Sequence, residues 1–413
     1  MNSNNNHILD INDSVSEDIN ISNDDIELVT RNNNDNEYQS LLGAPKQEKK
    51  TRLYWADCAR IYSMFAIVFL HCSNYGFEIH LIKTKDPNWK IVCIYNSLTR
   101  FSVPLFVLLS GTFFLDPSKS FSFKKLIKRN ILRLVTAFYF WAFVNSLYKN
   151  IARSNGPSFF SAEFQKNFIG NFLVGEEYLW FILMIIGCYI ISPFLRFFSD
   201  NIPLARYFIC LWLLWSSFIP TLDALLSLFN INHSGLDVWI SRWNFHFTKG
   251  FVGYFVTGYH IVKHVNIENF RNRCILYIIC VIDIIIYIKL TLYHGKKANG
   301  YSDSFRGNFS IFVAYYAFVT FLFFKYEVGR IKFSYKMAKI INKLSSLTFG
   351  MYLTHLLIRN ILLKFLNIDQ RNFIGITYSP VIGCPILFMI VSSLSILISY
   401  GISRIPILKN YII

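Results

Sequence analysis

Asp57, Arg60 and His71 are three ionisable side chains in one apolar stretch near the start of the chain. Asp57 and Arg60 are one helical turn apart, so they share a face and can form an ion pair. His71 follows after about three more turns, so it returns to that face about 16 Å farther along. One stripe of this helix therefore carries a guanidinium group near one end and a proton-exchanging imidazole near the other. The alternative is an interfacial ion pair and a histidine that reaches out from the helix end.

The next apolar stretch contains Arg100, Pro104 and the small pair Ser110 and Gly111. A proline in the middle of a membrane helix frees a backbone carbonyl, and a small pair lets another backbone approach closely. We therefore expect this helix to be irregular where it lines a cavity. The alternative for Ser110 and Gly111 is a role in helix packing alone.

The stretch from Phe123 to Arg133 is basic and amphipathic, and it includes Lys128 and Arg129. Guanidinium groups bind phosphate oxygens well because their donors form a planar fork. The stretch can thus clamp a ligand that carries phosphate. Its alternative role is to anchor the helix on anionic lipid.

The elements that must position these side chains are membrane helices. The chain of 413 residues is 53% hydrophobic and only 16% charged, which is too apolar for a soluble domain of this length. Ten stretches are long enough to cross lipid, namely residues 53–74, 91–115, 131–151, 178–198, 204–227, 247–263, 274–294, 308–325, 345–366 and 376–402. We predict an all-α protein, a polytopic membrane helix bundle with about ten transmembrane helices.

The net charge of +16 does not indicate binding to nucleic acid, because Lys and Arg gather between the apolar stretches. Loops on the side of the N-terminal flank hold about twice as many basic residues as the opposite loops, which predicts that both termini are cytosolic. The sequon at Asn232 then lies in an outer loop and can carry a glycan. The eight cysteines are scattered singly, so we expect reduced packing residues and no metal site.

Residues 1–50 hold ten acidic and four basic side chains and are rich in Asn and Ser. Such a segment buries too little apolar surface to offset its ordering entropy, so we expect a disordered cytosolic tail before a membrane domain at residues 51–413. In the tail, the run from Glu37 to Leu42 resembles sorting signals that cytosolic adaptors bind. A chance cluster is the alternative. The signal would direct this multi-pass protein of the plasma membrane or an endomembrane to endosomes or lysosomes.

A series of motifs between residues 53 and 405 resembles the acyltransferase-3 family of polytopic membrane O-acyltransferases, which act on cell-surface carbohydrates. In order, these motifs are Asp57-x-x-Arg60 with Arg60-x10-His71, Val103-Pro104-Leu105-Phe106 with Ser110-Gly111, the basic stretch, Leu179-Trp180-Phe181 with Ser192-Pro193, Gly253-Tyr254-Phe255 with Gly258-Tyr259, and Phe349-Gly350-Met351-Tyr352-Leu353-Thr354-His355. Three departures from the family pattern occur. The family's paired arginines are usually three residues apart, whereas Arg129 and Arg133 are four apart. The proline common just beyond them is absent, with Thr136 nearby, and Tyr178 stands where a histidine is common.

The resemblance implies transfer of an acyl group, usually from acetyl-CoA on the cytosolic side, to a hydroxyl of a glycan or glycolipid. The family's essential arginine and histidine fall on Arg60 and His71. We therefore interpret His71 as the general base, because neutral imidazole suits that role near neutral pH, and Asp57 as the residue that orients Arg60. Arg60, Arg129 and Arg133 would hold the phosphates of the donor, with Lys128, Ser110 and Gly111 beside them.

His355 is a second candidate base, and its alternative is a packing role. Arg100, Trp180 and Tyr352 are further candidates for the site. The sequence leaves open whether the acyl group passes directly or through a covalent relay. Two other classes of protein also fit: a transporter or flippase that uses the intramembrane Arg and His as a substrate or proton path, and a catalytically silent relative that binds partners.

Overall fold

The computed structural model describes residues 52–74, 87–152, 161–231, 234–243, 245–298, 302–369, 371–374 and 376–412. The chain separates into two units, Met1–Arg52 and Leu53–Ile413, and the description below concerns the second. The predicted tail, its signal from Glu37 to Leu42 and the sequon at Asn232 lie outside the described residues. The structure is 81% helical with almost no sheet, which confirms the predicted all-α class.

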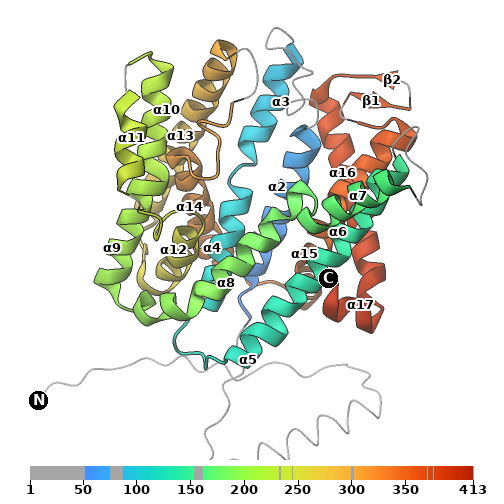
Figure 1. Cartoon of the computed structure of the whole chain (residues 1–413). Helices are drawn as coiled ribbons and strands as arrows, with labels where there is room; N and C mark the ends of the chain where they lie inside the picture. Colours follow the sequence, from blue (N-terminus) through green and yellow to red (C-terminus); the bar gives the residue numbers. More distant parts are fainter. Residues whose placement is uncertain are drawn as a thin grey trace, which may run out of the picture. The chain divides into compact units, whose positions relative to one another are not determined.

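The elements follow one another along the chain as shown in Figure 1. The first part forms α2 (Tyr54–Asn74), α3 (Pro87–Leu98), α4 (Ser102–Phe114), α5 (Phe123–Lys125), the π-helix η1 (Leu126–Ile131), α6 (Leu132–Ala152), α7 (Ala162–Val174), the 3-10 helix η2 (Glu177–Leu179) and α8 (Trp180–Ser199). The middle part forms α9 (Ile202–Trp212), the π-helix η3 (Leu213–Phe218), α10 (Ile219–Leu228), α11 (Ser234–Arg242), α12 (Val252–His264) and α13 (Phe270–Lys297). The last part forms α14 (Ile311–Tyr326), the 3-10 helix η4 (Val328–Arg330), α15 (Tyr335–Leu366), the antiparallel strands β1 (Asn372–Phe373) and β2 (Ile376–Thr377), α16 (Pro380–Ser403) and α17 (Pro406–Tyr411).

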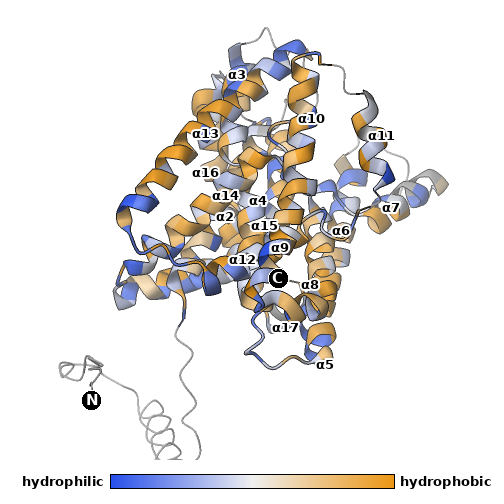
Figure 2. Ribbon diagram, turned by 90° about the vertical axis from the view of Figure 1, so that its left-hand side faces the viewer, coloured by the Kyte–Doolittle hydropathy of each residue, from blue (hydrophilic) through white to orange (hydrophobic). Residues whose placement is uncertain are grey.

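Eight helical segments of the described chain are long and apolar enough to cross a membrane, and they correspond to eight of the ten predicted stretches. The other two stretches form α2 and α12. The hydropathy of α2 is lowered by its ionisable side chains, and α12 has only 13 residues. The middle of α13 is hydrophobic (Figure 2), and side chains such as Ile278 and Ile282 are exposed there, as expected for contact with lipid. The structure therefore confirms a membrane helix bundle, with ten as an approximate count.

α2 packs against α4, α14, α15 and α16 (Figure 1). Its small residues Ala56, Ala59 and Ser63 are at most 1% exposed, and small side chains allow membrane helices to approach closely. This position explains how a helix with several ionisable side chains is accommodated. Those side chains face protein and cavities, where they can be paired, instead of lipid.

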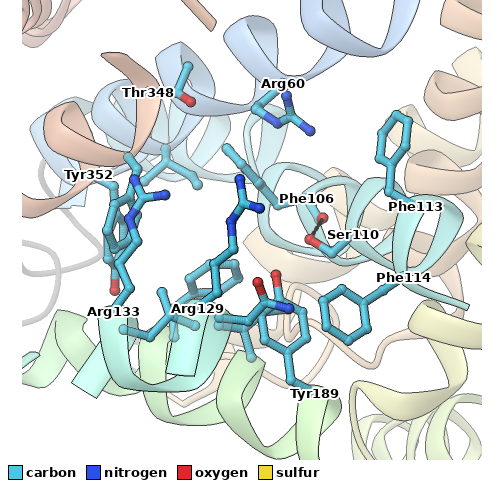
Figure 3. Close-up of a pocket in the computed structure, with 16 residues that line it drawn as sticks. Arg60, Phe106, Ser110, Phe113, Phe114, Arg129, Arg133, Tyr189, Thr348 and Tyr352 are labelled. Atoms are coloured by element: carbon cyan, nitrogen blue, oxygen red, sulfur yellow. Dashed lines mark hydrogen bonds between the residues drawn. The ribbon is translucent and has the colours of Figure 1, made fainter. Parts of the chain in front are cut away.

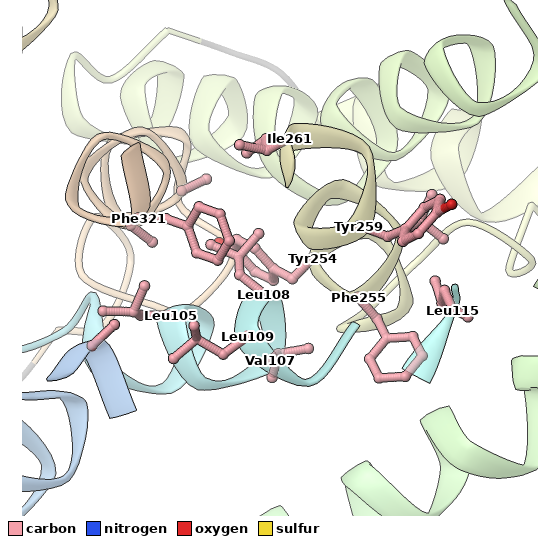
Figure 4. Close-up of a cluster of buried hydrophobic side chains, with 14 of the residues drawn as sticks. Leu105, Val107, Leu108, Leu109, Leu115, Tyr254, Phe255, Tyr259, Ile261 and Phe321 are labelled. Carbon is pink, nitrogen blue, oxygen red and sulfur yellow. The ribbon is translucent and has the colours of Figure 1, made fainter. Parts of the chain in front are cut away.

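α4 and α12 cross so closely that their backbones touch. A Cβ atom added at Gly258 would lie 1.9 Å from the carbonyl oxygen of Leu108, and one at Gly111 would lie 1.8 Å from that of Phe255. Thr112 Oγ1 also donates a hydrogen bond of 3.0 Å to the carbonyl of Gly258. Figure 4 shows the surrounding apolar cluster, to which both helices contribute. The two glycines thus make this crossing possible, and the crossing holds α4 against the rest of the bundle.

The predicted irregularity near Pro104 is present as a break between α3 and α4. Three residues separate the two helices, and Pro104 follows in the first turn of α4. Carbonyls at the end of α3 lose their helical partners at such a break. Tyr287 donates to the carbonyl of Ser97, and Tyr316 donates to the next carbonyl at 3.2 Å. The break leaves Arg100 outside regular helix, where it lines a cavity.

Candidate functional site

Two neighbouring cavities of about 380 Å³ each lie among α2, α4, α8 and α15. We name the first the arginine cavity, and its polar lining includes Arg60, Ser110, Arg129, Arg133, Tyr189 and Thr348. We name the second the histidine cavity, and its polar lining includes His71, Arg100, Trp180, Asp303, Arg359 and Asn360. Each volume lies within the range of small-molecule sites.

The arginine cavity concentrates positive charge. Arg60 enters from α2, Arg129 from η1 and Arg133 from the start of α6, and the three side chains converge on one space (Figure 3). No carboxylate is found among the described residues that line it. Like charges gathered in a partly dry space repel one another, so this cavity favours a ligand that carries several negative charges.

The π-helix η1 explains how Arg129 and Arg133 both reach the cavity. The N–H of Leu132 donates to the carbonyl of Ile127, which is the i to i+5 pattern of a π-helix. Because a π-turn holds more residues than an α-turn, two arginines four residues apart remain close to one face. Lys128 is exposed and does not line the cavity.

Asp57 and Arg60 form the ion pair that their spacing predicts, and α15 completes it. Arg60 Nη1 lies 3.1 Å from Asp57 Oδ1, and the Asp57 side chain is only 7% exposed. Ser345 Oγ donates to the same carboxylate oxygen at 2.6 Å and accepts from Arg60 Nη1 at 3.2 Å. The arrangement holds the guanidinium group of Arg60 at the edge of the arginine cavity.

Ser345→Ala is expected to lower the free energy of unfolding by about 1–3 kcal/mol, because it removes a donor to a buried carboxylate. Thermal unfolding of the purified protein in detergent would measure the change. Ser346→Ala is the matched control, since Ser346 is exposed and, within the described part of the chain, its side chain donates only to the carbonyl of Lys343. Equal stability of the two variants would contradict a role for Ser345 in the pair.

Ser110 and Gly111, predicted as neighbours of one ligand, have separate surroundings. Ser110 lines the arginine cavity, and its Oγ donates to the carbonyl of Phe106 at 2.9 Å. Gly111 lines neither cavity and instead contacts the backbone of Phe255. The geometry supports the packing alternative for Gly111.

The histidine cavity has a mixed polar lining. Arg100, from the break before α4, donates to Asn96 Oδ1 at 2.8 Å and to Asp303 Oδ1 at 3.3 Å. Trp180 stands at the start of α8 and is 39% exposed. Glu176 and Glu177 line the cavity beside it. This lining offers hydrogen-bond donors, acceptors and an aromatic surface to one ligand.

His71 and His355 lie next to each other, with ring centroids 5.2 Å apart. His355 Nδ1 is 2.7 Å from the carbonyl oxygen of Tyr352 and 3.2 Å from that of Met351. Carbonyls only accept, so Nδ1 carries the hydrogen and Nε2 is left as an acceptor. His355 Nε2 is buried and has no hydrogen-bond partner among the described residues. Only His71 of the two lines the histidine cavity, so His71 can meet a ligand and His355 lies behind it.

Sequence reasoning missed several residues of the site. They are Glu176, Glu177, Tyr189, Asp303, Asn308, Ser345, Thr348 and Arg359. The sequence could have indicated Arg359, which lies one turn after His355 in an apolar stretch. A charged side chain is energetically unfavourable in a membrane segment unless it is paired or has a functional role. Its Nη1 donates to the carbonyl of His71 at 2.8 Å. Asp303 has no local signal, since it reaches the cavity from a loop far along the chain.

A comparison with family models identifies residues 53–404 as an acyltransferase domain. No curated protein and no solved structure matches the chain. The matched range begins just before α2 and ends just after α16, so it contains the described lining of both cavities.

Proposed function

Since this chain belongs to the acyltransferase-3 family, we propose that it transfers an acetyl group from acetyl-CoA to a hydroxyl group of a glycan or glycolipid. One observation carries the proposal. The arginine cavity and the histidine cavity share three lining residues, so ligands in the two cavities would both contact the same three side chains. A donor and an acceptor must be brought together in this way for direct transfer.

The arginine cavity suits the donor. Coenzyme A carries several phosphate groups, and Arg60, Arg129 and Arg133 present guanidinium forks toward one space. Asp57 and Ser345 would orient Arg60. The excess of basic residues in the loops on this side supports entry of the donor from the cytosol.

The histidine cavity suits a carbohydrate acceptor. Sugar hydroxyls both donate and accept hydrogen bonds, and the carboxylates of Glu176, Glu177 and Asp303 can accept from them. Trp180 offers a partly exposed ring on which the apolar face of a sugar can stack. The acceptor would enter from the opposite side of the membrane.

His71 would act as the general base at the acceptor hydroxyl. As the hydroxyl oxygen attacks the thioester carbonyl carbon, its proton passes to the neutral imidazole. The new C–O bond forms and the C–S bond breaks, and the imidazolium of His71 gives this proton to the departing thiolate. The products are the acetyl ester and free coenzyme A, and His71 returns to its neutral form. The shared lining residues mean that the two cavities adjoin, which supports direct transfer without an acyl-enzyme.

The test is transfer of radiolabelled acetyl from acetyl-CoA by the purified full chain in lipid vesicles, with mass spectrometry of the glycans or glycolipids supplied. An acetyl mass gain that depends on the protein is the expected result. Gradient-driven uptake of a substrate with no transfer from acetyl-CoA would overturn the proposal in favour of a transporter or flippase. Absence of both activities and of acetyl-CoA binding would favour a silent scaffold.

Replacing both Arg129 and Arg133 by glutamine is expected to raise the KM for acetyl-CoA roughly 10- to 100-fold, because each loses a charge-assisted hydrogen bond to phosphate. Acetyl-pantetheine lacks the nucleotide phosphates, so its KM should hardly change. Steady-state kinetics with both donors measure the contrast. Lys128→Gln is the matched control, because it removes an adjacent charge outside the cavity. An equal rise in the KM for acetyl-CoA and for acetyl-pantetheine would contradict phosphate binding by Arg129 and Arg133.

A further inference from the structure

We propose that Ile67, Phe181 and Tyr352 form a partition that limits the length of the acyl group transferred; this inference rests on the proposed function. Among the described residues, these three are the ones that line both cavities. They come from α2, α8 and α15, so the partition joins the helices that also carry Arg60, Trp180 and His355.

Packing fixes the partition in place. The rings of Phe181 and Tyr352 have centroids 5.5 Å apart and are tilted by 60°. The hydroxyl of Tyr352 donates to the backbone carbonyl of Tyr178, which prevents free rotation of the ring. Ile67 is 4% exposed and Tyr352 is 7% exposed. Side chains packed in this way at the border of the two cavities have little freedom to move away from a larger ligand.

The location of the partition decides what it would contact. The phosphates of the donor bind to arginines on one side of it, and the base that serves the acceptor lies on the other. The thioester carbonyl must therefore reach the partition for the two to react. The chain that follows this carbonyl then lies against Ile67, Phe181 and Tyr352. An acetyl methyl group is small enough to fit beside them, whereas each added methylene group must displace a packed side chain.

A pocket that rejects one methylene group discriminates by about 10- to 200-fold in kcat/KM. We therefore expect the wild-type protein to use acetyl-CoA much better than butyryl-CoA or hexanoyl-CoA. Phe181→Ala should raise the ratio of butyryl to acetyl transfer at least about tenfold, because it opens the wall from the α8 side. Ile67→Val removes one buried methyl group and should raise the same ratio by a smaller factor.

The experiment measures transfer from acetyl-, propionyl-, butyryl- and hexanoyl-CoA by the full-length protein in vesicles. Phe114→Ala is the matched control, because Phe114 lines the arginine cavity alone and stacks on Tyr189 with ring centroids 4.0 Å apart. Its ratio of butyryl to acetyl transfer should equal that of the wild type.

Two results would overturn the partition: efficient hexanoyl transfer by the wild type, or an unchanged chain-length profile in Ile67→Val together with any folded Phe181 variant. Ile67→Val is so conservative that a misfolded Phe181→Ala protein does not remove the test. No transfer from any donor by the wild type is a different result, and it would overturn the proposed function itself.

Discussion

Replacing His71 by alanine is expected to lower acetyl transfer by about 10²- to 10⁴-fold while the protein still folds and binds acetyl-CoA. This range is the usual contribution of a general base. His71 alone of the adjacent histidines lines the histidine cavity, where the acceptor would bind, and the donor would bind to arginines in the other cavity. The measurement is kcat with labelled acetyl-CoA, together with thermal unfolding and a binding isotherm for the donor.

A matched control is His294→Gln, which replaces another helical histidine that lines neither cavity. Its rate should equal that of the wild type. Added imidazole should partly restore the activity of His71→Ala, because the substitution leaves space open to the histidine cavity. More than a tenth of the wild-type rate in His71→Ala would remove His71 from the role of base and would direct attention to His355.

Gly258→Ala is expected to cost more than about 3 kcal/mol of stability, which is above the usual range for overpacking. The added methyl group would lie 1.9 Å from the carbonyl oxygen of Leu108, and this obstacle is backbone. The methyl group can be accommodated only if α4 and α12 separate. Such a shift would also weaken the 3.0 Å hydrogen bond from Thr112 to the carbonyl of Gly258. The thermal midpoint and the fraction of monodisperse protein in detergent measure the loss.

Gly187→Ala provides the comparison, because a Cβ atom there has no neighbour within 4 Å. Gly187 lies inside α8 and Gly258 lies inside α12, so both variants make the same chemical change within a helix. Gly187→Ala should be as stable as the wild type or slightly more stable, since alanine favours helix over glycine. A Gly258→Ala protein of wild-type stability would show that the two helices do not cross at this contact.

The two sets of predictions address different properties of the molecule. The loss of acetyl transfer in His71→Ala concerns the reacting groups. The loss of stability in Gly258→Ala concerns the crossing of α4 and α12, which holds α4 in place. Ser110 in α4 lines the arginine cavity, so a shifted α4 would also reshape the donor side. A Gly258 variant that folds partially should therefore lose affinity for acetyl-CoA, which His71→Ala should not.

The sequence by itself determined the class of the protein and the helix that carries its most informative residues. Hydropathy is a local property, so long apolar runs identified the membrane helices without any knowledge of their packing. The ion pair of Asp57 and Arg60 was predictable because the two residues are one helical turn apart. Their shared face with His71 was predictable because His71 lies about three turns beyond Arg60. Ordered motifs indicated the acyltransferase-3 family, which the match over residues 53–404 confirmed.

Only the tertiary structure decided which residues meet. Ser345 donates to Asp57 although 288 residues separate them, and no local pattern links positions so far apart. The same holds for Tyr352, which lines both cavities, and for Gly111, whose close partner is the backbone of another helix. A cavity is the space left between packed helices. Its lining therefore depends on how the helices cross, which the periodicity of each separate helix does not specify.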